Sequence, residues 1–324
     1  MNINFLSQST GLSTVQKTKF KNSTAPNYRL NAGKDVFVKS TNNISFGSAD
    51  KAKYAEIKRD VTDYFLNAKT LDVNEIEKIV KKYSPSTNFA DIKKIPRNAN
   101  VHTSTVAYTH EPSQFLLNES GKIAVETLPK TIYFNFNTPA KNQRDERIIL
   151  IDRLVHEMTH ILQDEEGSDT RKLDYFNAFL STQTNNDRAI RNIQAINLIY
   201  NTVEKAMIGA LADSLPPTTT SLPQKINEKT DIDTLFVKKI KTSPSTLMRN
   251  ALSRTLNVAN MQFGGIDRNF ALDFVILKAK NEKEAYQNAL DSNKELLGLN
   301  CKTDFDLRIE MYQKMIDVAQ SMKK

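Results

Sequence analysis

Residues 148–164 read IILIDRLVHEMTHILQD, and their apolar positions recur with the period of an α-helix. At about 100° per residue, these apolar side chains fall within one arc of roughly 160°. The arc predicts a helix that packs on a core through Ile148, Leu150, Ile151, Leu154, Val155, Met158, Ile161 and Leu162. His156, Glu157 and His160 lie on the opposite side of the wheel, so we expect them to face a cleft or solvent.

His156 and His160 are one helical turn apart and enclose Glu157 in an HExxH motif. Residues i and i+4 project from the same side of a helix, so the two imidazoles can bind one cation, with the carboxylate beside a metal-bound water. The chain has four histidines, and two of them have this spacing, which favours a metal site. Two core histidines would lie on the apolar face, where this pair does not; a solvated polar face is the remaining alternative.

The composition is that of a globular protein without cysteine-based sites. Of the 324 residues, 39% are hydrophobic, which is enough for a proper core. The single cysteine, Cys301, excludes an internal disulfide and a cysteine-based zinc site, so metal ligands must be histidine and carboxylate. The net charge is +8, but lysine and arginine are spread along the chain, and we expect no nucleic-acid partner.

Hydropathy gives no indication of a membrane protein. No apolar stretch approaches the ~20 residues of a transmembrane helix, and the first residues are too polar for a secretory signal. We therefore expect no transmembrane segment and a soluble protein, either cytoplasmic or exported by a non-standard route.

Composition changes divide the chain into a leader and one domain. Residues 1–48, rich in Asn, Ser and Thr, are expected to be a disordered leader. The domain, residues 49–324, opens with a helical part, 49–96, whose pattern predicts two amphipathic helices ended by Ser84-Pro85. In the next part, 97–213, β-branched and aromatic residues predict one small antiparallel sheet beside the motif helix, with strands in 101–109, 123–125 and 131–136.

The rest of the domain is predicted to be helical, which makes the fold class α+β and mostly helical. Thr138 and Pro139 supply an N-cap and a first-position proline for the motif helix, which should run to Glu165 or Glu166. Residues 214–230, rich in Thr and Pro, should form a surface loop before the helical part over 231–324. The predicted helices on either side of this loop are 187–212, 231–240, 245–259, 268–297 and 304–322.

The stretch from Val155 to Leu162, preceded by the strand pattern Thr131–Phe136, resembles the zincin superfamily of metallopeptidases. The resemblance covers about residues 100 to 165 and one later element. It implies a zinc ion completed by a third ligand downstream, and an upstream edge strand, here Thr131–Phe136, that binds an extended peptide. The glycine and histidine that follow the motif in metzincins are absent here, so a gluzincin-like glutamate from another helix is implied as the third ligand.

Glu282 is the preferred third ligand, because residues 281–286 resemble the gluzincin ligand helix. The small residue expected three positions later is Ala285, and the polar residue expected four positions later is Tyr286, where the family usually has Asp or Asn. Glu282 also shares a face with small and apolar residues, where a carboxylate needs either zinc or a basic partner. The runner-up is Glu204, and Glu284 points about 160° away from Glu282 on the wheel.

These features predict a zinc metallopeptidase, an endopeptidase that hydrolyses a polypeptide substrate. Metal-activated water would attack the peptide bond, with Glu157 as general base and His156, His160 and Glu282 as zinc ligands. The alternative is a catalytically inactive, zincin-like helical binding protein. Candidates for stabilising the oxyanion are Tyr286, Tyr200, Tyr175, His110 and His102.

Overall fold

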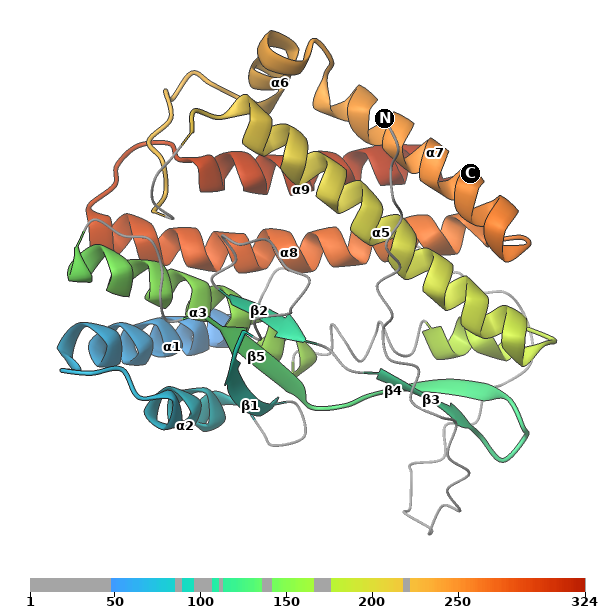
Figure 1. Ribbon diagram of the computed structural model, residues 1–324, viewed down its shortest axis with the longest axis horizontal. Helices are drawn as coiled ribbons and strands as arrows, with labels where there is room; N and C mark the ends of the chain where they lie inside the picture. The colour runs from blue at the N-terminus through green and yellow to red at the C-terminus, as the bar shows by residue number, and fades with distance from the viewer. Residues whose placement is uncertain are drawn as a thin grey trace.

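The computed structural model of the protein describes residues 48–84, 89–95, 107–110, 113–135, 142–165, 176–217 and 222–323. These residues are mostly helical, with a few short strands gathered beside and below the helices in Figure 1. The predicted class, α+β and mostly helical, is confirmed. The expected disordered leader lies outside the described residues, except for Ser48, which opens the first helix.

A three-stranded sheet lies beside the motif helix. Its order is β1 (Phe89–Lys94), β5 (Lys130–Phe134) and β2 (Ala107–His110), and β5 runs parallel to β1 and antiparallel to β2. Side chains two apart on a strand share a face, and Ile132 and Phe134 accordingly point together into the core. The central position of β5 leaves β2 as the edge strand next to the motif helix.

A separate hairpin packs on the helical part of the molecule. Its strands, β3 (Ser113–Leu117) and β4 (Ile123–Thr127), pair antiparallel. The turn between them contains Gly121 at φ +72°, a conformation that glycine adopts without a Cβ clash. Ile123 and Val125 of β4 are buried in the core formed by the helices from α5 (Asn186–Ser214) to α9 (Asp304–Met322), and not in the core below the three-stranded sheet.

The motif helix is α3 (Gln143–Glu165), and its apolar face is buried as predicted. This face packs in one core with the three-stranded sheet, with α1 (Ser48–Asn67) and with α2 (Val73–Tyr83). The buried residues of the predicted arc are Ile148, Leu150, Ile151, Leu154, Val155, Met158, Ile161 and Leu162. The polar face is also buried, which differs from the expectation of an open cleft, because a second long helix covers it.

That second helix is α8, which lies between α3 and the C-terminal helix (Figure 1). It begins at Arg268, where Asp267 caps it by accepting a hydrogen bond from the Phe270 N–H, and it ends before Gly298 at φ +58°. The helices of this part are α5 (Asn186–Ser214), α6 (Ile232–Ile240), α7 (Pro244–Phe263), α8 (Arg268–Leu297) and α9 (Asp304–Met322). All five correspond to predicted helices, with ends that differ by a few residues at most.

The predicted sheet is wrong in two respects. The structure has two sheets where one antiparallel sheet was expected, and strand 123–125 belongs to the hairpin. Strands β1 and β3 were not predicted; β1 carries two lysines and pairs in parallel with a strand far away in the sequence, which a local pattern does not reveal. Thr131–Phe136 is also not an edge strand, since its described part, β5, is paired on both sides.

The start of the motif helix also differs from the prediction. The helix begins at Gln143, and the side chain of Asn142 accepts a hydrogen bond from the Asp145 N–H. The predicted cap, Thr138-Pro139, lies outside the described residues.

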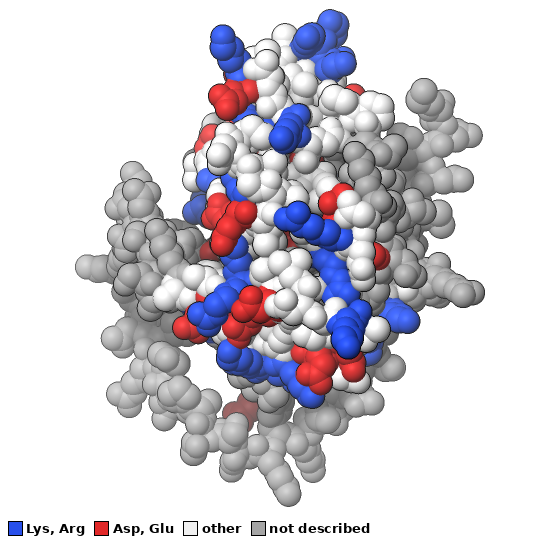
Figure 2. Space-filling view, turned by 90° about the vertical axis from the view of Figure 1, so that its left-hand side faces the viewer, with Lys and Arg blue, Asp and Glu red and all other residues white. Residues whose placement is uncertain are grey.

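The surface carries charges of both signs. Figure 2 shows basic and acidic side chains intermingled on one face, with no large area of a single sign there. Among the described helices, none is long and apolar enough to cross a membrane.

Candidate metal centre

His156, His160 and Glu282 meet between α3 and α8. The two imidazole Nε2 atoms are 3.3 Å apart. Each lies 3.6 Å from a different carboxylate oxygen of Glu282, Oε2 for His156 and Oε1 for His160. The three potential ligand atoms lie within 4.8 Å of one another, so the three residues form a group that could hold a metal ion.

The spacing fits a small, four-coordinate cation. A tetrahedral ion with bonds of about 2.0–2.2 Å to nitrogen and oxygen holds its ligand atoms about 3.3–3.6 Å apart. The two imidazole nitrogens, 3.3 Å apart, fit this range, and each of them lies 3.6 Å from one of the two carboxylate oxygens of Glu282. Two imidazoles and one carboxylate also leave the fourth position of such an ion for a small molecule.

Gln163 orients the ring of His160. Its amide nitrogen donates to the backbone oxygen of Asn281, at 3.0 Å, and to Oε2 of Glu284, at 2.9 Å. Both partners are acceptors only, so the amide oxygen must face Nδ1 of His160, at 3.1 Å. A neutral His160 then carries its hydrogen on Nδ1 and presents the lone pair of Nε2 to Glu282 and His156.

His156 is held by packing. Its ring meets the ring of Tyr286 edge to face at a centroid distance of 4.6 Å, and its Nδ1 is buried without a hydrogen bond among the described residues. One turn earlier on α3, Asp152 is buried and accepts a hydrogen bond of 2.7 Å from Asn293 of α8. Burial raises the pKa of Asp152 to about 6, although Arg153 and His156 act in the opposite direction.

Glu157 is buried beside the two histidines, and a residue of β2 holds it. The hydroxyl of Thr109 donates a hydrogen bond of 2.7 Å to Oε2 of Glu157. The strand that carries Thr109 is the edge of the three-stranded sheet, so the carboxylate lies where the sheet edge meets the motif helix. Neither Thr109 nor Gln163 was singled out from the sequence; Gln163, three residues after His160, has a helical spacing that could have indicated it.

The charges in the cluster favour a bound cation. Burial disfavours a charged imidazole, yet the carboxylates of Glu282 and Glu157 outweigh it and raise the pKa of His160 to about 9. Burial would likewise raise the pKa of Glu282, but His160 and His156 hold it far below its ordinary range. Without a metal, the positive charge between the two carboxylates is therefore the extra proton of the His160 imidazole. A metal ion must displace this proton to bind.

The two alternative glutamates lie outside this group. Oε1 of Glu204, on α5, accepts hydrogen bonds from the hydroxyls of Tyr200 and of Tyr312, the latter at 3.0 Å. Burial and the nearby Glu282 raise the pKa of Glu204 to about 7. Glu284, expected to point away, in fact reaches α3 through its hydrogen bond with Gln163.

Two of the oxyanion candidates, Tyr286 and Tyr200, lie near the cluster, and the hydroxyl of each makes a hydrogen bond to another residue. Tyr286 accepts a hydrogen bond of 3.0 Å from Arg308, and Tyr200 donates its own hydrogen to Glu204. His110 is exposed at the end of β2, against the ring of Tyr133. Tyr175 and His102 lie outside the described residues.

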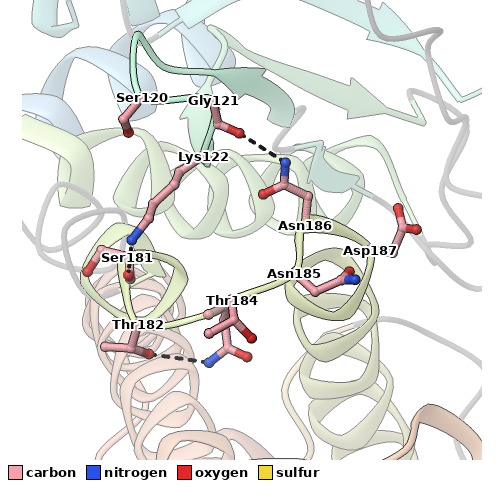
Figure 3. A pocket seen from close by; sticks show the side chains of 10 residues that line it. Ser120, Gly121, Lys122, Ser181, Thr182, Thr184, Asn185, Asn186 and Asp187 are labelled. Atoms are coloured by element: carbon pink, nitrogen blue, oxygen red, sulfur yellow. Dashed lines mark hydrogen bonds between the residues drawn. The ribbon is translucent and has the colours of Figure 1, made fainter.

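A polar hollow of about 620 Å³ lies elsewhere, between the tip of the β3–β4 hairpin and the start of α5 (Figure 3). Two hydrogen bonds join its walls: Lys122 Nζ donates to the backbone oxygen of Ser181 at 2.7 Å, and Asn186 donates to that of Gly121 at 3.0 Å. None of the residues of the metal centre lines it, and its described contacts account for the docking of the hairpin on the helices.

Comparisons of the chain with protein-family models, with curated proteins and with solved structures find no match.

Proposed function

We propose that the protein is a zinc-dependent metallopeptidase of the zincin type, with His156, His160 and Glu282 as a gluzincin-like ligand set and Glu157 as general base. One observation carries the proposal. The glutamate that the local sequence of α8 favours as third ligand meets both histidines of the HExxH motif, although more than a hundred residues separate them. A solvated polar face would give no reason for this convergence.

Zinc is the metal that suits these donors best. It accepts imidazole nitrogen and carboxylate oxygen in tetrahedral sites, and three protein ligands with an open position are typical of catalytic zinc. When bound, zinc lowers the pKa of a water molecule toward ~7 and polarises a substrate carbonyl.

Glu157 supplies the proton transfers. Its carboxylate accepts a proton as water attacks the peptide carbonyl, and it then donates that proton to the leaving amine. Thr109 binds one carboxylate oxygen, which fixes the plane of the group and leaves the other oxygen for the proton. Burial of Glu157 and both histidines keeps this chemistry away from bulk water, where such interactions are weaker.

The edge strand β2 supports a polypeptide substrate. Its inner side pairs with β5, and no described strand pairs with its other side. An extended peptide can pair with such an edge through its backbone, and Thr109 would place that peptide next to Glu157. Binding along a strand edge does not require a chain end, so we propose an endopeptidase.

Metal analysis and one substitution test the proposal. The wild-type protein, purified without chelators, should contain about one zinc per chain and cleave an unfolded protein substrate. Glu157→Gln keeps the shape of the side chain and all metal ligands, so it should retain zinc and lose cleavage. Glu146→Gln, in the first turn of the same helix, is the matched control and should retain both.

Absence of zinc would contradict the proposed cofactor. Zinc binding without cleavage by the wild type would favour the inactive binding protein instead, and undiminished cleavage by Glu157→Gln would exclude the proposed base.

A further inference from the structure

Glu204 is a partly buried carboxylate near the candidate metal centre that the proposed reaction does not use. It lies on α5, and α9 contributes the hydroxyl of Tyr312, which donates to its Oε1 at 3.0 Å. Tyr200, one turn earlier on α5, donates to the same oxygen. Both of these hydrogen bonds go to Oε1 of Glu204.

The surroundings of Glu204 connect it with the metal centre. The ring of Tyr312 stacks on that of Tyr286 at a centroid distance of 5.7 Å, and Tyr286 packs on His156 at 4.6 Å. Glu204 also lies close enough to Glu282 for the charge of one to disfavour the charge of the other. A carboxylate and three tyrosines thus lie on one side of the cluster of His156, His160 and Glu282.

This combination suits a positive charge. A carboxylate oxygen can accept hydrogen bonds from an ammonium or guanidinium group, and such charge-assisted bonds are the strong ones. Tyrosine rings add attraction for cations. Lys278, on α8, also acts on Glu204 through its charge.

We infer that Glu204, with Tyr200 and Tyr312, forms a subsite that binds a cationic group of the substrate beside the scissile bond. The inference rests on the proposed function and adds a substrate class to it, namely peptides with an ammonium or guanidinium group near the cleavage site. Two sources share this chemistry: the side chain of lysine or arginine, and the free amino terminus of a peptide cleaved close to its end.

Two pairs of short peptides distinguish these sources. One pair contains lysine or acetyl-lysine at the same position, and the other has a free or an acetylated amino terminus. The wild type should prefer the charged member of one pair by about tenfold or more in kcat/KM, since a hydrogen bond between charged groups contributes at least that much. The pair that shows the preference identifies the source of the charge.

Glu204→Gln tests the residue itself. The amide oxygen can still accept hydrogen bonds from both tyrosines, but the negative charge is gone, so the ratio between charged and neutral peptides should fall to about one. Glu228→Gln, an exposed position in the loop before α6, removes one charge outside the subsite and should leave the ratio unchanged. Zinc analysis and thermal unfolding of each variant show whether the compared proteins are folded and contain zinc.

Binding separates this inference from the proposed activity. Zinc-loaded Glu157→Gln should bind the preferred charged peptide about tenfold more tightly than its neutral partner, and Glu157→Gln/Glu204→Gln should not. If the wild type cleaves nothing, the proposed activity fails while this measurement still decides the subsite. The inference would be overturned if the wild type cleaved or bound the charged and the neutral peptide of each pair equally well. It would also be overturned if the preference for the charged peptide persisted in Glu204→Gln.

Discussion

The hydroxyl of Thr109 in β2 donates a hydrogen bond of 2.7 Å to Oε2 of Glu157 in α3. The bond joins the edge of the sheet to the motif helix at the residue that we propose as general base. A carboxylate held on one oxygen cannot rotate freely, so the sheet edge determines how the Glu157 carboxylate is oriented. In this role Thr109 is a positioning residue that acts through Glu157.

Thr109→Val should lower kcat about tenfold, because a hydrogen bond to a charged group contributes about 1.5–3 kcal/mol. Valine has the shape of threonine and suits a strand, so zinc content and KM should change little. Thr109→Ser restores the hydroxyl and should recover most of the lost kcat. Steady-state kinetics of the three proteins on one peptide checks this expectation, and a wild-type kcat in Thr109→Val would contradict it.

Gln163→Met should weaken zinc binding by about 10–100-fold, the usual effect of losing a hydrogen bond that orients a metal-bound histidine. Methionine fills a similar volume but cannot accept the Nδ1 hydrogen of His160. The matched control is Gln287→Met at an exposed position of α8, where zinc affinity should stay unchanged.

Competition with a chelator of known affinity measures the effect, and thermal unfolding without metal shows whether the fold is intact. Equal zinc affinity in wild type and Gln163→Met would mean that the observed hydrogen bond does not orient His160.

The grouping of His156, His160 and Glu282 could be predicted from the sequence because its signals are local. His156 and His160 are one turn apart, and Glu282 was preferred because residues 281–286 resemble the ligand helix of gluzincins. The contacts of Gln163 with α8 and of Thr109 with Glu157 could not be predicted, because they depend on how α3 packs on α8 and on β2. The residues around Gln163 and Thr109 carry no sequence pattern that specifies Glu284 and Glu157 as their partners.

The fold shows the same division between local and non-local information. Helices α8 and α9 begin and end where their periodicity and caps indicate, since those signals lie within a few residues. The strand β1 was missed because its stability comes from parallel pairing with β5, and only Phe89 and Ile92 face the core in a strand that also carries two lysines. Because β5 pairs with β1 as well as with β2, it is the central strand. The edge strand next to the motif helix is therefore β2, where Thr131–Phe136 was expected.

Glu282→Gln should lower zinc affinity by more than the roughly 10–100-fold that the loss of a supporting hydrogen bond costs, because a charged ligand is replaced by a weak neutral one. Glu284→Gln on the same helix is the control and should keep most of the affinity, since that carboxylate contacts Gln163 and not the imidazole Nε2 atoms. Glu204→Gln should also retain zinc. Zinc titration of the three variants ranks them, and a larger loss in either control than in Glu282→Gln would assign the third ligand to another residue.

Asp152→Asn should make the metal-free protein more stable at neutral pH, by up to about 3 kcal/mol. The pKa of Asp152 is raised from 3.8 to about 6 in the folded protein, mainly by burial. Between these values the folded state binds the proton more tightly than the unfolded state does. The stability of the wild type relative to the variant is therefore greatest below about pH 4, falls as the pH rises, and is fully lost above about pH 6.

Urea unfolding of both proteins between about pH 4 and pH 7, with a chelator present, measures this difference directly. Groups that do not interact with Asp152 titrate equally in the two proteins and cancel in the comparison. Asp213→Asn, at an exposed position near the end of α5, provides the control for the removal of one carboxylate outside the core. A constant difference between wild type and Asp152→Asn over this range would mean that Asp152 is ionised as readily in the core, beside Asn293 and Arg153, as in water.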